Sequence, residues 1–86
     1  MIVNVFTKKG AEIEEVLNEL TKKLVEQGMG QIAFIWDKKG ENNGWTAFQG
    51  ELTYGLQNRW SNSLVYNQLE AMLKKKDPEI IIKKIK

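Results

Sequence analysis

Two apolar stripes at helical spacing, each enclosed between short runs rich in β-branched residues, constrain the fold of this chain more than any other feature. In the first stripe the apolar side chains recur every three or four positions, at Ile13, Val16, Leu17, Leu20 and Leu24. This spacing places them along one side of a helix. Glutamates are concentrated in the first turns and Lys22 and Lys23 lie nearer the end, which complements the helix dipole. We therefore predict a helix over residues 11–27, capped by Gly28.

The second stripe predicts a helix that begins near Ser61 or Ser63, either of which suits an N-cap, and runs to about residue 76. Its apolar positions are Val65, Leu69, Met72 and Leu73. Three lysines follow in the last turn, where positive charge is favourable. Asp77-Pro78 then ends the helix, because a residue that precedes proline disfavours the helical conformation.

Four runs outside the two helices have the length and the β-branched or aromatic content of strands, and they span residues 2–6, 31–37, 45–52 and 79–85. The run 31–37 carries apolar side chains on both of its faces. In 45–52 the more apolar face is expected to point to the core, and it consists of Thr46, Phe48, Gly50 and Leu52. We expect the polar segment 38–44 to form a long hairpin loop and Gly50 to mark a β-bulge.

The resulting order of elements is β-α-β-β-α-β in a chain of 86 residues, which suits a single domain over 1–86. Right-handed crossovers would place both helices on one face of a four-stranded antiparallel sheet. The predicted class is therefore α+β, with the two-layer ferredoxin-like or split βαβ arrangement. The other face of the sheet would then be uncovered. Either it contacts another molecule, or it carries a half-exposed aromatic residue of the kind that many protein surfaces show.

The composition lacks the groups on which catalysis and metal binding most often depend. The chain has no histidine and no cysteine, so it offers no imidazole and no thiolate. The glutamates of the first predicted helix are scattered around it and are not paired across a cleft. No glycine-rich phosphate loop of the Walker or dinucleotide-binding type is present. We expect a protein that is not an enzyme, with no catalytic residues, no cofactor and no metal site.

Charge and hydropathy bear on the location and origin of the chain. Thirteen basic and eleven acidic residues give a net charge of +2, a weaker basic excess than most nucleic-acid binders carry. The lysine-rich composition is typical of A+T-rich genomes, so we expect a small bacterial, phage or plasmid protein. No apolar run approaches the roughly 20 residues that span a bilayer, and the first residues do not resemble a signal peptide. We expect a cytoplasmic location and no membrane partner.

Aromatic residues are the main candidates for a binding surface. Three tryptophans are many for this length, and at least one is expected in the core. Trp, Tyr and Arg are enriched at binding hot spots, and irregular segments such as 53–62 often carry binding residues. The candidate partner-binding residues are Trp45, Tyr54, Asn58, Arg59 and Trp60. We predict a small interaction or regulatory protein that binds a protein partner, or a second copy of itself, through the open sheet face and the 53–62 loop.

Lysine clusters support an alternative, nucleic-acid binding through phosphate contacts and exposed aromatics. The candidate phosphate contacts are Lys74, Lys75, Lys76, Lys83 and Lys84, which also read as ordinary solvated turns and helix ends. The segment 44–48 is partly similar to the third-strand motif of the RNA-recognition module. However, Trp45 and Phe48 are three residues apart and point to opposite faces, so the similarity does not place the chain in that family. A third hypothesis is a small-ligand pocket between subunits.

Overall fold

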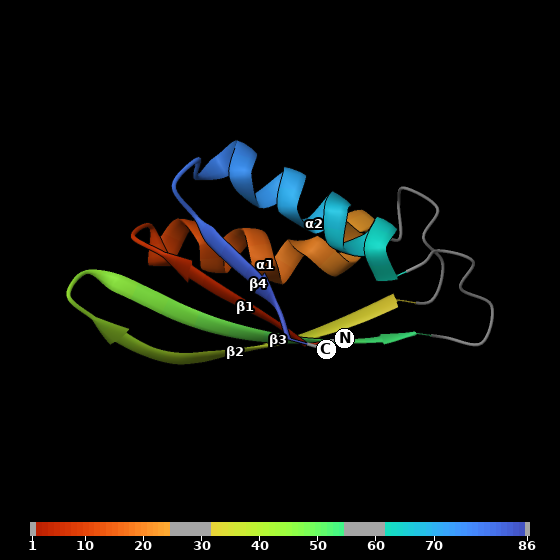
Figure 1. Ribbon diagram of the computed structural model, residues 1–86, viewed down its shortest axis with the longest axis horizontal. Helices are drawn as coiled ribbons and strands as arrows, with labels where there is room; N and C mark the ends of the chain where they lie inside the picture. The colour runs from red at the N-terminus through yellow and green to blue at the C-terminus, as the bar shows by residue number, and fades with distance from the viewer. Residues whose placement is uncertain (1, 25–31, 55–61, 86) are drawn as a thin grey trace.

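The computed structural model describes residues 2–24, 32–54 and 62–85. Its elements are β1 (Ile2–Thr7), α1 (Gly10–Leu24), β2 (Ile32–Asn42), β3 (Trp45–Tyr54), α2 (Asn62–Lys76) and β4 (Ile81–Lys84). The strands form one antiparallel sheet in the order β2-β3-β1-β4. Figure 1 shows both helices on one face of this sheet and no other described element on the opposite face. The predicted α+β class with a four-stranded antiparallel sheet is confirmed.

The boundaries of the elements differ from the predicted ones at several ends. The segment predicted to complete the first helix, with its cap Gly28, lies outside the described residues. Helix α2 begins at Asn62, so Ser63 lies inside it and is not its cap. Strand β4 is shorter than predicted, because the residues after Pro78 first form a turn. None of the helices in the described part of the chain is long and apolar enough to cross a membrane.

The hydrophobic core lies between the sheet and the two helices. In β1 buried and half-buried residues alternate strictly, so that Val3 and Val5 face the helices. The two predicted helical stripes supply most of the remaining core, with Ile13, Leu17, Leu20, Val65, Leu69 and Leu73 buried. The predicted inward face of β3 is confirmed for Thr46, Phe48 and Gly50, all of which are buried. The side chain of Leu52 lies outside the described residues.

Gly50 makes room for the indole of Trp36. The two residues are paired across β2 and β3, and a Cβ atom at Gly50 would lie 2.5 Å from Cζ3 of the indole. Trp36 packs against the core, as expected for at least one tryptophan. The predicted bulge at Gly50 is wrong, because the register shift lies in β2 between Lys38 and Gly40. The glycine is required by a close approach of a ring and not by an irregular backbone.

The β2–β3 hairpin is tighter than its polar sequence indicates. Residues 38–44 do not form a long loop, since β2 continues to Asn42 and β3 begins at Trp45. The turn consists of Asn43 and Gly44, with φ angles of 53° and 83°. Positive φ at both central residues is the requirement of a type I′ hairpin turn, and Asn-Gly is its preferred sequence. The polar side chains of 38–42 are exposed, so the strand pairing continues here without apolar burial.

A buried polar cluster joins the two crossovers at one end of the sheet. The hydroxyl of Thr7, at the end of β1, donates to Oδ2 of Asp77 at 2.6 Å and accepts from the amide of Lys9 at 3.0 Å. Oδ1 of Asp77 accepts from the amide of Glu79 at 3.1 Å. Thr7 is fully buried and Asp77 is 3% exposed. These bonds connect the start of α1 to the end of α2.

Candidate interaction face

The uncovered side of the sheet, here called the open face, is formed by the residues that alternate with the core residues of each strand. Because successive side chains of a strand point to opposite faces, the burial of Val3, Val5 and Phe48 identifies the residues on the other side. The open face comprises Ile2, Asn4, Phe6, Ile35, Asp37, Gly40, Asn42, Trp45, Ala47, Gln49, Glu51, Ile81, Lys83 and Ile85.

The strand register arranges these residues in rows that cross the sheet. The first row is apolar and runs, from β2 to β4, through Gly40, Ala47, Phe6 and Ile81. The middle row is polar and runs through Asp37, Gln49, Asn4 and Lys83. The last row runs through Ile35, Glu51, Ile2 and Ile85, where the amide of Ile85 donates to the carbonyl of Ile2 at 2.8 Å. Two rows with large apolar side chains therefore enclose a polar row.

Large aliphatic side chains on this face are exposed to solvent. Ile35 is 60% exposed, Ile81 42% and Ile85 52%. A hollow of 530 Å³ lies at the hairpin end of this face. Its lining includes Trp45, two residues of the first row, Phe6 and Ala47, and hairpin residues 40–43. A surface that combines exposed aliphatic groups with an aromatic-lined hollow has the character of an interaction site.

Trp45, one of the predicted partner-binding residues, lies on the open face at its hairpin end. Its ring is half-buried, and Nζ of Lys8 lies 5.0 Å from the ring centroid, within cation–π range. Tyr54 is the last residue of β3, and its side chain lies outside the described residues. Asn58, Arg59 and Trp60 also lie outside the described residues. The predicted 53–62 loop is wrong at both ends, because residues 53 and 54 belong to β3 and α2 begins at Asn62, and its binding role stays a prediction.

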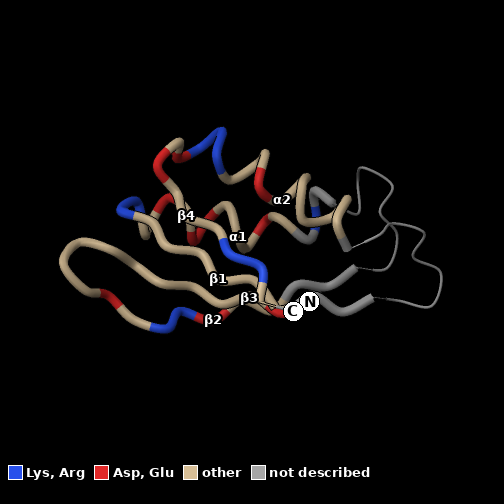
Figure 2. Tube along the Cα trace, viewed as in Figure 1, with Lys and Arg blue, Asp and Glu red and all other residues tan. Residues whose placement is uncertain are grey.

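The predicted phosphate-contacting lysines lie in two separate places, shown in Figure 2 as distinct blue segments of α2 and β4. Lys74, Lys75 and Lys76 form the last turn of α2 in the helix layer. Lys83 lies on the open face beside Asn4, whereas Lys84 pairs with Val3 and points to the other side of β4. The five lysines therefore do not form one continuous surface, because Lys83 faces away from the helix layer.

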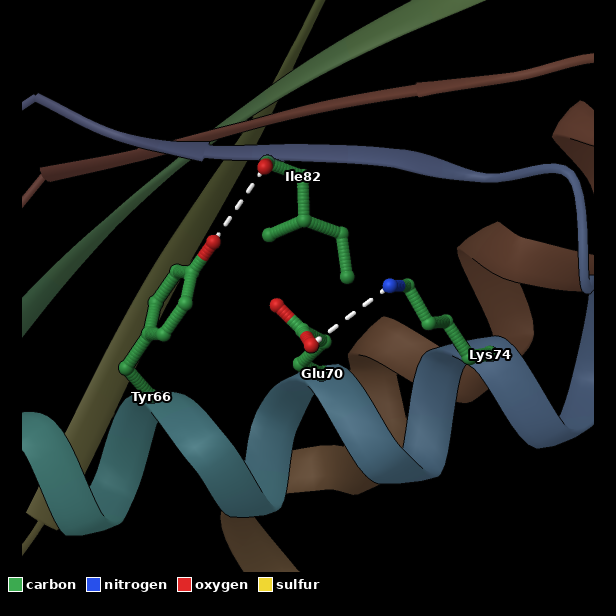
Figure 3. Close-up of polar contacts among 4 residues, drawn as sticks. All are labelled: Tyr66, Glu70, Lys74 and Ile82. Carbon is green, nitrogen blue, oxygen red and sulfur yellow. Dashed lines mark hydrogen bonds and ion pairs between the residues drawn. The ribbon is translucent and has the colours of Figure 1, made fainter.

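Carboxylates of the same chain accompany the lysines of α2. Nζ of Lys74 lies 3.5 Å from Oε1 of Glu70 one turn earlier (Figure 3). Lys75 and Lys76 line a groove between the helices together with glutamates of α1, namely Glu12, Glu15 and Glu19. An incoming phosphate would meet these negative charges as well as the lysines, which weakens the electrostatic attraction.

Tyr66 attaches the edge strand β4 to the helix layer. Its hydroxyl, which extends from α2 in Figure 3, donates to the carbonyl of Ile82 at 3.2 Å. Burial raises the pKa of the Tyr66 phenol above its usual value of 10.0, and the neighbouring Glu70 carboxylate raises it further. Ile82 packs against the core, so Ile81 and Lys83 on either side of it face the opposite way. Tyr66 thus helps to position two residues of the open face.

Sequence reasoning did not select several residues of this face, chiefly Phe6, Ile35, Asp37 and Ile81. Ile80, Ile81 and Ile82 are three successive isoleucines, so their sequence gives no alternation that would identify the outward one. The structure separates them, with Ile80 buried, Ile81 exposed and Ile82 half-buried. Each face of this segment carries two isoleucines and one lysine, so no local signal in the sequence distinguishes the outward face.

The open face presents isoleucine, aromatic, amide and charged side chains. Within the described ranges, no three histidine, cysteine, aspartate or glutamate side chains come together in a way that could hold a metal ion. Comparison of the chain with protein-family models, with curated protein sequences and with solved structures finds no match.

Proposed function

We propose that this chain is a small, non-enzymatic interaction domain that binds a protein surface through the open face of its sheet. The observation that carries the proposal is the pair of rows with exposed isoleucines on either side of a polar row. Burial of such side chains in a complex releases about 25 cal/mol per Å² of apolar surface. The polar row supplies hydrogen-bonding groups that give the contact its orientation.

We infer that the sheet and helices form a ferredoxin-like, or split βαβ, domain. The strand order supports this inference, because each helix connects two strands that enclose a third. Strand β3 lies between β1 and β2, which α1 connects, and β1 lies between β3 and β4, which α2 connects. In such a two-layer domain one face of the sheet stays available for binding.

Protein binding is favoured over nucleic-acid binding by the placement of charge. The lysines of α2 lie beside glutamates in the helix layer, and the described lysines on the open face are confined to its margin. Binding to a phosphate backbone ordinarily uses a continuous basic surface. The cytoplasmic location and the phage or plasmid origin remain predictions from the sequence.

Site-specific photo-crosslinking in the cell tests the proposal. A photoreactive phenylalanine analogue is placed at Ala47 on the open face, and at Ala71, an exposed position on α2, as the matched control. We expect discrete protein adducts from position 47 and several-fold fewer from position 71. No protein adduct from position 47, equal yields from both positions, or adducts with nucleic acid would contradict the proposed function.

A further inference from the structure

We propose that the molecule bound by the open face is a second copy of this chain, packed face to face about a two-fold axis parallel to the strands. The inference rests on the proposed function of the open face and names its partner. The axis would pass between β1 and β3, the two central strands. The charges of the polar row and the sizes of the side chains in the apolar row support this arrangement.

The polar row carries opposite charges at its two ends. Asp37 lies on edge strand β2 and Lys83 on edge strand β4, with Gln49 and Asn4 between them. Both edge strands lie about 7 Å from the midline of the sheet, since neighbouring strands are about 4.8 Å apart. Within the chain Asp37 meets only the exposed Lys39, at 3.9 Å, among the residues described. Lys83 has no ion pair with an acidic residue in the same described ranges.

A half-turn about the proposed axis keeps every residue in its row and exchanges the two edges of the sheet. Asp37 then faces the partner's Lys83, and Lys83 faces the partner's Asp37, which gives two equivalent ion pairs. Gln49 faces the partner's Asn4, and both amides can donate and accept hydrogen bonds. The contact is self-complementary, as the interface of a two-fold dimer must be.

The first apolar row is also complementary to itself under this rotation. Phe6 meets the partner's Ala47, and Ile81 meets the partner's Gly40, so that a large side chain lies opposite a small one each time. In the last row Ile35 meets the partner's Ile85, and Glu51 meets the partner's Ile2. Alternation of large and small groups lets facing layers interdigitate as they do in a protein core.

A face-to-face dimer could also form about a two-fold axis that is perpendicular to the strands and runs along the polar row. The strand register disfavours this second axis. It would place Asp37 opposite the partner's Asp37 and Lys83 opposite the partner's Lys83. Like charges that face each other across an interface disfavour that arrangement. The charges of the polar row therefore select one of the two face-to-face orientations.

The size of the face indicates a weak, reversible dimer. Four strands about 4.8 Å apart and rows about 6.8 Å apart give a flat area on the order of 400 Å² per copy. Stable interfaces bury about 800 Å² per partner, so this contact belongs to the low end of the range. We expect monomer and dimer to exchange and the dimer to dissociate on dilution.

Sedimentation velocity over a concentration series, at low ionic strength, tests the arrangement through charge reversal. Asp37→Lys and Lys83→Asp are each expected to weaken the dimer about tenfold, because each turns two attractive pairs into two repulsive ones. Mixed together, the two variants are expected to form a heterodimer of near wild-type affinity, since both of its pairs are then attractive. Lys84→Asp is the matched control and is expected to leave the dimer unchanged.

Two results would overturn the inference. The first is a wild-type chain that stays monomeric at all concentrations, and the second is a pair of charge-reversed variants whose mixture associates no better than either alone. Single variants that dimerise as well as the wild type, together with a mixture that associates more tightly than the wild type, would indicate the perpendicular axis and also overturn it. Crosslinking from position 47 to a different protein, with a monomeric wild type, would overturn the dimer and support the proposed function. A monomeric wild type that also gives no protein crosslink from position 47 would contradict both proposals.

Discussion

Removal of either partner in the Thr7–Asp77 hydrogen bond is expected to destabilise the domain strongly. The two residues are 70 positions apart in sequence, and their 2.6 Å bond is buried. Asp77→Ala deprives the Thr7 hydroxyl and the Glu79 amide of their acceptor. Thr7→Val keeps the shape of the side chain but removes the hydroxyl. Oδ2 of Asp77 then loses its hydrogen-bond donor, and the Lys9 amide loses its acceptor.

The magnitude follows from the burial of these groups. A buried polar group that loses its partner costs about 1–3 kcal/mol, and a hydrogen bond that water can replace costs about 0.5–1.5 kcal/mol. We therefore expect Asp77→Ala to lower the free energy of unfolding by about 2–4 kcal/mol and Thr7→Val by about 1.5–3 kcal/mol. Domains of this length have a total stability of about 4–13 kcal/mol, so either loss is a large fraction.

A double-mutant cycle measured by urea unfolding isolates the contribution of the bond. Because both single variants remove the same interaction, the double variant is expected to lose about 1–2 kcal/mol less than the sum of the two. Thr7→Ser keeps the hydroxyl and serves as the control. Asp77→Asn retains an oxygen for the Glu79 amide and extends the test to a milder change, with an expected loss of about 1–2 kcal/mol.

Additivity of the Thr7→Val and Asp77→Ala losses would refute this reasoning. It would mean that the two side chains do not stabilise the domain through each other. A larger loss for Thr7→Ser than for Thr7→Val would refute it as well, since Thr7→Ser removes only the methyl group and Thr7→Val removes the hydroxyl.

Three further changes test the hairpin and the attachment of β4. Gly50→Ala is expected to displace the indole of Trp36 and lower stability by about 1–3 kcal/mol, and an unaltered near-ultraviolet circular dichroism spectrum would contradict it. Gly44→Ala, at a φ of 83°, is expected to lower stability by about 1 kcal/mol in urea unfolding, and no change would argue against the type I′ turn. The raised pKa of Tyr66 means that the folded chain holds the phenol proton more tightly than the unfolded chain does. The protonated phenol therefore contributes fully to the free energy of unfolding below pH 10, and this contribution is lost as pH rises through the folded-state pKa. Stability measured above pH 10 should therefore fall more steeply with pH in the wild type than in Tyr66→Phe, and equal slopes would exclude Tyr66 as the cause.

The helices and the inward face of β3 could be predicted because their signals are local. Ile13, Leu17 and Leu20 recur at helical spacing, and any compact fold buries such a stripe. The alternation of Thr46, Phe48 and Gly50 likewise identifies the buried side of β3 without knowledge of its neighbours.

Features that depend on contacts between distant residues could not be predicted in this way. Asp77 reads in sequence as the end of a helix, and only its contact with Thr7 explains its burial. Gly50 reads as a bulge, and only the pairing with Trp36 shows that a ring occupies the space above it. In both cases the partner comes from another strand or helix.

The sequence by itself determined that this chain forms two amphipathic helices and four strands around one core, because periodicity is a property of each segment alone. The tertiary structure decided which residues share a row of the open face. Register between strands that are distant in sequence brings Asp37 and Lys83 to the two ends of one row, and puts Phe6 beside Ala47 and Ile81. A shift of any strand by two residues would preserve its alternation but place different side chains together, so no segment of the sequence specifies that surface alone.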